Sequence, residues 1–469
     1  MSTLRIGGLA SGMDTETIIS TMLESRQAEV DRVQAQVDTY TEKYASWSEL
    51  STRLGDLRSV TGDLTSYTTW NQKTVTSSNS SYVTATTTST AAADYEIFID
   101  YLAKAHRIAS DAQTSITSEL SLSGDFVVGG ETVTLEAADT LEDVVDKINS
   151  AASSMDAEEK VKAYIVGKQL VVERAATGDT DISITDGATG VLKSLGVLNP
   201  DESIKNEIQE ARDLSVTING VAYTGSSNTG VTDAVSGVTF NFLKAMTVGS
   251  TETISIENDT ATIKSLLTDF ITNYNDTMDY IQTQSTVQIS SDSSQVTATG
   301  ILQGDTLLSS MFIRFRSIAS SIETNPNYRN QNFNSLYKIG IGFAGEDNQL
   351  SILDEAKLDD ALENNFDDVM ELMRSWGEDV GGETKGAGIM RQMDDYIYSL
   401  TDPISGSVTL RQQSIEDMIS YDENKIYSLN QDMSDYETQL WEHFANMESM
   451  ISEMNSQINY LMSALGQTG

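Results

Sequence analysis

Two histidines are the first candidates for acid–base or metal chemistry in this sequence. His106 lies in the run KAHR (residues 104–107), and His443 lies beside Phe444 in a region of helical periodicity. A Ser-His-Asp triad or a metal site needs partner side chains that converge in space, and these can be far apart in sequence. We interpret His106 as a solvated residue at a strand edge and His443 as a surface or flanking residue. Neither histidine predicts catalysis.

Paired carboxylates and glycine-rich runs are the other candidates. Two nearby acids can share general acid–base work, and the sequence contains the pairs Asp359-Asp360 and Asp367-Asp368. Both pairs lie in helical patterns, where adjacent side chains point about 100° apart, so we interpret them as solvating an exposed face. The run GEDN (residues 345–348) lacks the EF-hand spacing and predicts a turn. The run GGLASG (residues 7–12) follows no strand pattern and does not indicate a dinucleotide site.

The composition sets limits on partners and on chemistry. A chain of 469 residues should divide into several domains. Its 70 acidic and 29 basic residues give a net charge of −41, which argues against nucleic acid as a partner because binding to phosphates depends on Lys and Arg. There is no cysteine, so disulfides, a thiolate nucleophile and a Cys-type zinc site are excluded.

Targeting signals are also informative. No apolar run reaches the length of about 18 residues that a membrane span needs. The start, MSTLRIGGLASGMDTETII, has no apolar core after its single arginine, so we expect no cleaved secretory signal peptide. The protein is then expected to stay in the cytoplasm or to leave by a route that needs no such signal.

Apolar residues recur at steps of three and four in both terminal regions. Near the C-terminus the series, with one four-four break after Leu440, is Ile426, Leu429, Met433, Tyr436, Leu440, Phe444, Met447, Ile451, Met454, Ile458, Leu461 and Leu465. Near the N-terminus the series is Val30, Val33, Val37, Tyr40, Tyr44 and Trp47. These steps predict coiled-coil seams, and the break predicts a stutter that unwinds the supercoil locally. We expect the two helices to pair with each other or with copies in other subunits.

The middle of the chain has a different pattern. From about residue 76 to residue 257, alternating apolar residues indicate strands, with hairpin signals at residues 129–130 (GG) and 219–220 (NG). Thr140, with Asp143 three residues later, approximates a capping box before a short helix. Helical periodicity returns at about residue 260, with a possible hairpin over residues 339–353 and a glycine-rich loop over residues 377–388. From about residue 409 one helix is predicted to run almost to Gly466.

Together these patterns predict an α+β multidomain fold. The terminal helices form a coiled-coil stalk, a helical bundle follows, and one or two strand-rich head domains are inserted. Asp14 or Thr15 is expected to cap the first helix. The predicted divisions are a leg domain (1–45 and 428–469), a bundle (46–75 and 258–427), a β-rich head (76–120 and 212–257) and a second β-rich head (121–211). This organisation favours an assembly component over a soluble enzyme.

Several short motifs resemble the flagellar filament cap family, also called hook-associated protein 2 or FliD. The opening GLASGMDT (residues 8–15), followed by Ile18, Ile19 and Met22, resembles the start of that family. The tail FANME (444–448), with NSQ (455–457) and YL (460–461), resembles its C-terminal signature. Internal landmarks that agree are GVTF (237–240), NYN (273–275), IGI (339–341) and LSILDEAKL (350–358). Their order and spacing are kept across nearly the whole chain outside the head.

The resemblance implies a structural role without catalytic residues, cofactors or metals. It implies export of the unfolded chain through the flagellar type III apparatus, with an export chaperone, and assembly with itself into a small closed ring. The ring would lie outside the cell at the distal tip of the filament and help flagellin subunits fold and insert. No nucleic acid or membrane insertion is implied. The residues predicted to make coiled-coil and oligomer or filament contacts are Val30, Val33, Val37, Tyr40, Met433, Tyr436, Leu440, Phe444, Met447, Ile451, Met454, Ile458 and Leu461.

The sequence departs from the family at one turn and leaves other functions open. The family's usual turn before the Leu-x-Leu-Asp segment has an acidic-Gly pair, whereas here Gly345 comes earlier, before residues 346–348 (EDN). The head is the family's most variable part, so no residue there is assigned a role. The alternatives are a host- or surface-binding adhesin, a secreted hydrolase with a carboxylate pair in a head cleft, and a flagellin-like or hook-junction subunit. A flagellin would polymerise into long filaments, whereas a cap would stop at a small ring.

Overall fold

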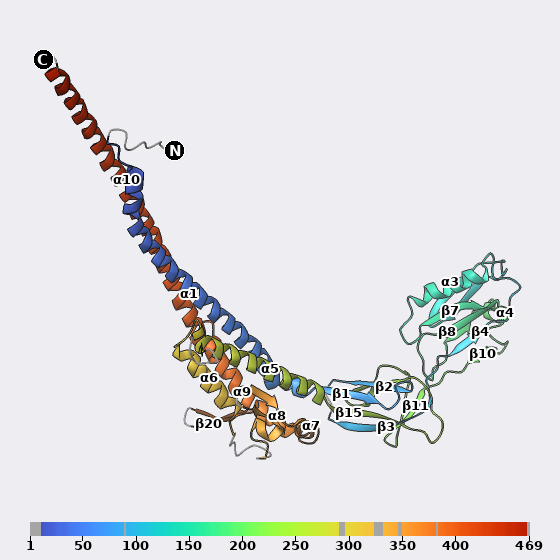
Figure 1. Ribbon diagram of the computed structural model, residues 1–469. Helices are drawn as coiled ribbons and strands as arrows, with labels where there is room; N and C mark the ends of the chain where they lie inside the picture. Colours follow the sequence, from blue (N-terminus) through green and yellow to red (C-terminus); the bar gives the residue numbers. More distant parts are fainter. Residues whose placement is uncertain are drawn as a thin grey trace. The chain divides into compact units, whose positions relative to one another are not determined.

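The computed structural model describes residues 11–88, 91–289, 296–322, 332–345, 349–380 and 383–466. The chain divides into two compact units, Met1–Thr69 with Thr260–Gly469, and Trp70–Asp259. The first unit is mainly helical and the second is mainly strands (Figure 1). This confirms the predicted α+β multidomain fold, with a strand-rich part inserted between helical ones. The expectations for residues 7–10 and for the turn at residues 346–348 lie outside the described residues.

Two long helices from the two ends of the chain dominate the first unit. They are α1 (Thr15–Thr65) and α10 (Ser407–Gly466), and they lie side by side in Figure 1. Asp14 is the N-cap of α1, because its carboxylate accepts a hydrogen bond from the backbone N–H of Thr17 at 3.0 Å. The prediction of one helix from about residue 409 to Gly466 is confirmed. No helix in the described part of the chain is long and apolar enough to cross a bilayer.

Shorter helices form a bundle with the C-terminal half of α1. They are α5 (Thr260–Ser285), α6 (Thr306–Ala319), α7 (Glu355–Asn364), α8 (Phe366–Arg374), α9 (Ile389–Thr401) and the 3₁₀ helix η1 (Leu336–Ile339), while α2 (Tyr67–Trp70) follows α1. Among them, α5, α8 and α9 are the ones that contact α1 most. The α1 residues Leu50, Leu54 and Leu57 are fully buried. Burying each leucine contributes about 1.5–3 kcal/mol, so this half of α1 is the apolar axis of the bundle.

Three hairpins complete the first unit. They are β16 (Val287–Ile289) with β17 (Val296–Thr299), β18 (Ile341–Ala344) with β19 (Gln349–Ile352), and β20 (Trp376–Val380) with β21 (Glu383–Ala387). The pair β18–β19 confirms the hairpin expected over residues 339–353. The prediction of a loop over residues 377–388 is wrong, because this segment is the hairpin β20–β21. Gly377 and Gly386 have φ values of 69° and 68° inside it, a conformation that glycine adopts without strain.

Asn275 and Gly340 hold the hairpin β18–β19 in place. From α5, the Asn275 amide donates to the backbone oxygen of Leu350 at 2.9 Å and accepts from its N–H at 2.8 Å. Gly340 has a φ of 87°, and a Cβ added there would lie 2.3 Å from the backbone oxygen of Asp354. Two of the motifs that carry the family resemblance, NYN and IGI, therefore contain residues with a structural role.

The second unit contains two hydrophobic cores. The first lies between a five-stranded sheet in the order β1-β15-β3-β11-β12 and a three-stranded sheet in the order β13-β14-β2. Its largest fully buried side chains are Phe240 and Phe242, whose rings stack 5.6 Å apart. The strands are β1 (Lys73–Ser77), β2 (Val83–Thr87), β3 (Ala93–Tyr101), β11 (Leu214–Ile218), β12 (Val221–Gly225), β13 (Val231–Val235), β14 (Val238–Phe242) and β15 (Glu252–Asn258). The Asn219-Gly220 signal indeed marks the β11–β12 turn.

The second core is formed by the middle of the insertion. Its sheets have the orders β10-β4-β8-β7 and β6-β5-β9, and helix α3 packs on β6 and β7. The elements are β4 (Arg107–Ala109), β5 (Gly124–Val128), β6 (Glu131–Leu135), α3 (Leu141–Ala152), β7 (Val161–Val166), β8 (Gln169–Arg174), β9 (Ile184–Asp186), α4 (Val191–Leu195) and β10 (Asn206–Gln209). The predicted domain boundaries within the two units stay predictions.

The capping box at Thr140 is present and offers a local stability test. The Thr140 hydroxyl accepts from the Asp143 N–H, and the Asp143 carboxylate accepts from the Thr140 N–H at 2.9 Å. Replacing Thr140 by alanine should destabilise the start of α3 by about 1 kcal/mol. Amide hydrogen exchange in residues 141–152 of the full chain should then be about fivefold faster. Thr140→Ser keeps the acceptor and should change the rates little; equal rates for Thr140→Ala and the unchanged protein would contradict the role of the box.

Candidate functional site

The predicted contact residues lie on an antiparallel helix pair that we call the stalk, residues 11–48 with residues 412–466. Three contacts set its register. Gln412 donates to the Ser48 hydroxyl at 3.0 Å, the Arg26 guanidinium lies 4.0 Å from the centre of the Tyr436 ring, and the Ser11 N–H donates to Glu448 at 3.3 Å. The paired part of the stalk therefore runs from the bundle at residues 48 and 412 to residues 11 and 448, and α10 continues beyond it to Gly466.

On α1 the predicted seam faces α10. Val30, Val33 and Val37 are buried, and Tyr40 is half-buried. The Tyr40 hydroxyl accepts a hydrogen bond from the Gln36 side chain at 3.0 Å, which keeps its polar end at the surface. Closer to the bundle, Trp47 is fully buried. The structure thus brings the four predicted α1 residues to the helix interface.

On α10 the predicted seam changes along its length. Leu440 is buried, with 9% of its surface exposed. Among the predicted contact residues of α10, Met433, Tyr436, Phe444, Met447 and Ile451 are half-buried. The first two of these lie level with the part of α1 around Arg26, and the others lie near its start. The structure brings these six residues to the same side of α10 as their spacing predicts.

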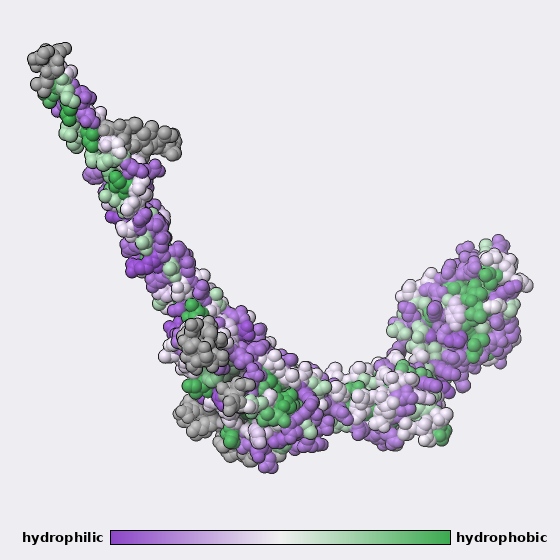
Figure 2. Space-filling model, viewed as in Figure 1, coloured by the Kyte–Doolittle hydropathy of each residue, from purple (hydrophilic) through white to green (hydrophobic). Residues whose placement is uncertain are grey.

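Beyond Ile451 the α10 seam lies in the open within the described residues. Met454, Ile458 and Leu461 are 59%, 47% and 57% exposed. Further exposed apolar side chains in the same stretch are Met450, Tyr460 and Met462. Figure 2 shows green apolar residues among purple polar ones toward this end of the helix. An apolar stripe of this kind on a helix marks a surface that a partner would cover. Whether these three residues make oligomer or filament contacts stays a prediction.

Sequence reasoning missed one residue of the stalk interface, Asp422. Counting back four residues from Ile426 places Asp422 in the same seam, and it is 92% buried, with 8% of its surface exposed. The apolar series that the sequence predicts begins at Ile426, so it does not include an acidic residue in phase before it. The periodicity itself was the available signal. An acidic residue that is mostly buried in a helix seam is uncommon.

His106 is buried, so the prediction of a solvated residue is wrong. Its exposed fraction is 1%, and both ring nitrogens have partners. Nδ1 accepts a hydrogen bond from the Ile182 N–H at 2.8 Å, and Nε2 lies 3.2 Å from the Glu207 carboxylate. Since Nδ1 accepts, Nε2 carries the hydrogen of the neutral ring and donates it to Glu207. Burial results from neighbouring strands that the sequence alone could not place.

The same histidine does not form a convincing metal site. His106, Asp181 and Glu207 are close enough to hold an ion together. However, Nδ1 is occupied by a backbone donor, and the Asp181 carboxylate lies on that side of the ring, 3.6 Å from Nδ1. Binding a metal at Nε2 would break the bond to Glu207 and leave one ring ligand. The arrangement is that of a hydrogen-bonded core histidine.

Asp359 and Asp360, one of the two predicted carboxylate pairs, each have a bonding partner of their own on the bundle. Asp359 and Glu355 both bind the ammonium group of Lys264, at 2.6 Å and 2.9 Å. Both bonds raise the pKa of Lys264 above its ordinary value, and the bond to Asp359 has the larger effect. Asp360 accepts instead from the Asn364 amide at 2.9 Å. The adjacent acids therefore have separate partners, which gives them no shared acid–base function.

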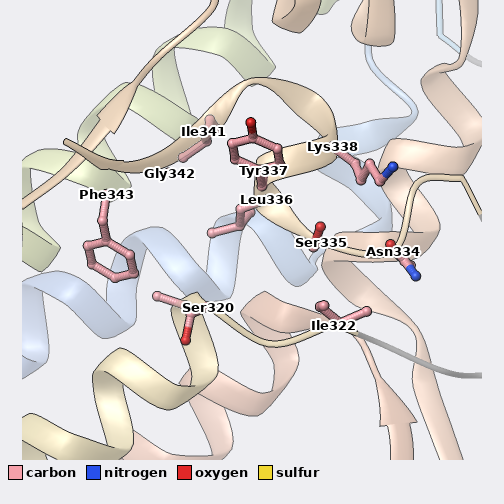
Figure 3. A pocket seen from close by; sticks show the side chains of 11 residues that line it. Ser320, Ile322, Asn334, Ser335, Leu336, Tyr337, Lys338, Ile341, Gly342 and Phe343 are labelled. Carbon is pink, nitrogen blue, oxygen red and sulfur yellow. The ribbon is translucent and has the colours of Figure 1, made fainter.

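A recess of about 480 Å³ lies beside α6 and the hairpin β18–β19 (Figure 3). Its apolar wall includes Ile322, Leu336, Ile341 and Phe343, and Lys338 contributes a basic group. The described residues that line it include no carboxylate and no histidine. The recess can therefore accept an apolar group, but its described lining contains no acid–base pair.

Family comparison connects this geometry to known proteins. A family model described as the flagellar hook-associated protein 2 C-terminus matches residues 211–456. A second, described as the flagellar hook-associated protein 2 N-terminus, matches residues 11–106. The matched regions together cover the stalk as far as residue 456, the bundle and the first core of the inserted unit. The buried residues of the second core lie outside both matched regions.

Individual relatives agree. The flagellar hook-associated protein 2 of Thermotoga maritima is 26% identical over 366 residues, which cover 74% of this chain but 56% of that protein. The B-type flagellar hook-associated protein 2 of Pseudomonas aeruginosa is 24% identical over 405 residues, 82% of this chain and 81% of that protein. The chain thus spans little more than half of the first relative's length.

A solved structure shares the fold. The crystal structure of the D1-D2-D3 domains of the flagellar cap protein FliD from Escherichia coli has a TM-score of 0.51 and 20% sequence identity. It covers 79% of this chain and 99% of that chain. At this identity the likeness supports the fold alone. Because the C-terminal family model matches more than half of the chain, this protein belongs to the flagellar hook-associated protein 2 family.

Proposed function

We propose that this protein caps the flagellar filament, where copies of it form a small closed ring and help exported flagellin subunits fold and insert. The observation that carries the proposal is the stalk, whose distal end presents the exposed residues Met454, Ile458 and Leu461. A seam that is closed toward the bundle and open at its end is suited to contact other subunits. The match to the flagellar hook-associated protein 2 family supports a role in the flagellum.

The proposed work is mechanical, with no catalytic step. His106, Asp359 and Asp360 have bonding partners that explain their presence. In this proposal the protein reaches the outside through the flagellar type III apparatus, with an export chaperone and without a cleaved signal peptide. Copies of the same chain, flagellin and the filament tip are the further partners. The thirteen predicted seam residues are proposed as the contacts within the stalk, between copies and with the filament.

The mass of the purified full chain in solution tests this function. Light scattering should show one discrete oligomer that stops growing with concentration, because a closed ring leaves no free interface. The same measurement without residues 428–469 locates the ring contacts in the stalk if the oligomer is lost. Growth into open-ended polymers would favour a flagellin-like subunit. A monomer at every concentration would contradict the ring.

A further inference from the structure

The paired part of the stalk ends where two motifs of the family resemblance meet. The N–H and the hydroxyl of Ser11, in the motif GLASGMDT, both donate hydrogen bonds to the carboxylate of Glu448, in the motif FANME. Gly12 follows with a φ of 75°, a turn that glycine adopts without strain and that lies just before α1. Ser11 therefore holds the chain that precedes α1 against the side of α10.

The apolar stripe of α10 that no described residue covers begins next to this contact. Its exposed side chains, in order, are Met450, Met454, Ile458 and Leu461. The first of them lies two residues beyond Glu448. Removing side chains of this kind from water is favourable, so the stripe marks a surface for a cover. The segment that leads back from Ser11 to residue 4 starts at the same place.

This segment is long enough to cover the stripe. An extended chain advances about 3.3–3.6 Å per residue, so Ile6 can lie up to about 17 Å from Ser11. A helix rises about 1.5 Å per residue, which places Met454 about 9 Å and Ile458 about 15 Å beyond Glu448. Ile6 is therefore within reach of both positions.

The segment also has one apolar side. In the run TLRI (residues 3–6), Leu4 and Ile6 alternate with Thr3 and Arg5. In an extended chain this alternation places the two apolar side chains on one side and the two polar ones on the other. The two glycines that follow, at residues 7 and 8, disfavour a helix. An extended segment with one apolar side is suited to lie along an apolar stripe.

The charges of the two segments are complementary. Glu453 is exposed and directly precedes Met454, so it flanks the stripe. Its own helix supplies no cation nearby, since no lysine or arginine follows Lys425 in the sequence. Arg5 is the one basic residue among residues 1–25, and Arg26 after it already stacks on a tyrosine of α10. Arg5 is thus the charge that matches Glu453.

We propose that residues 4–9 lie along α10 of the same chain and cover its apolar stripe. Leu4 and Ile6 would pack on the stripe beyond Met450, and Arg5 would pair with Glu453 at its edge. This contact goes beyond the proposed function, because it forms within one chain and needs no ring. The same stripe is proposed to contact other copies and the filament, so the segment competes with those partners and limits association before they arrive.

Cysteine pairs test the contact directly, because the chain has no cysteine of its own. In the full chain, Ile6→Cys is combined with Met454→Cys or with Ile458→Cys and oxidised in dilute solution. We expect a disulfide within one chain, seen as a monomer on a non-reducing gel whose thiols no longer react with an alkylating reagent. The matched control combines Ile6→Cys with Tyr427→Cys, an exposed position on α10 that lies about 30 Å before Glu448 and is out of reach.

Hydrogen exchange of the full chain gives a second readout that needs no cysteine. Ile6→Asp should speed exchange in residues 450–461 by about fivefold or more, because it removes an apolar contact and places a charge against the stripe. Thr3→Asp adds the same charge on the opposite side of the segment and should change exchange by no more than about twofold. Equal exchange in the two variants would contradict the cover.

The outcomes separate this inference from the proposed function. Disulfides that form only between chains would assign the stripe to a second copy and overturn the inference. It is also overturned if neither distal pair cross-links, or if both do so no better than the Tyr427→Cys control. A chain that cross-links internally but stays monomeric in light scattering upholds the cover and contradicts the ring. A ring whose chains lack the internal disulfide upholds the ring and contradicts the cover.

Discussion

Replacing Leu440 by aspartate is expected to open the distal half of the stalk and abolish the proposed capping of the filament. Leu440 is the buried member of the α10 seam in this half, with 9% of its surface exposed, and Ile19 is its buried counterpart on α1, 3% exposed. A charge placed there costs several kcal/mol unless it is paired, and helix separation relieves that cost. The inserted unit has cores of its own and should remain folded.

Three measurements check this expectation. Hydrogen exchange should show loss of protection in residues 15–30 and 433–451, while residues 97–109 stay protected. Light scattering should show loss of the oligomer, and motile cells carrying the variant as their only cap should lose normal filaments. Gln439→Asp adds the same charge at the neighbouring exposed position and should be tolerated. Normal filaments with Leu440→Asp would contradict the role of the seam.

Replacing His106 by alanine is expected to destabilise the inserted unit by about 2–5 kcal/mol. The change leaves the buried Ile182 N–H without its acceptor, removes the bond to Glu207 and creates a cavity. The His106 backbone also accepts from the Arg174 N–H at 2.9 Å, so the residue joins two strands of the second core. The loss should therefore spread through that core.

Scanning calorimetry of the full chain should show the transition of the inserted unit at a lower temperature. His106→Asn retains an acceptor near the position of Nδ1 and should lose less stability than His106→Ala. His443→Ala removes an exposed histidine from α10 and should leave this transition unchanged. If His106→Ala were as stable as the unchanged protein, the two hydrogen bonds of the ring would contribute nothing to stability. That result would contradict the interpretation of His106 as a structural core residue.

Local patterns in the sequence predicted the elements well where neighbours along the chain decide them. Steps of three and four predicted both terminal helices, because side chains at that spacing share one face of a helix. Asn219-Gly220 predicted the turn between β11 and β12, since those residues adopt positive φ readily; their φ values are 47° and 79°. Asp14 and the Thr140 capping box were predicted for a similar reason, because their bonding partners lie within three residues.

Glycine signals were less decisive. The glycine-rich segment at residues 377–388 predicted a loop, but its backbone pairs as the hairpin β20–β21. Positive φ at Gly377 and Gly386 is equally compatible with a loop and with a hairpin. Pairing depends on whether another segment offers backbone donors and acceptors, which glycine content does not show.

The sequence by itself determined the terminal helices, the strand-rich insertion and which positions of each terminal helix form its apolar seam, because each depends on periodicity or on residues a few positions apart. Only the tertiary structure decided which side chains are buried by distant neighbours. His106 is enclosed because β8, β10 and the chain at Ile182 meet around it, and Asn275 is bonded to Leu350 because α5 passes β19. Asp422 is covered because α1 lies against α10 there. Burial is a property of surfaces in contact, and a one-dimensional pattern does not say which surfaces meet.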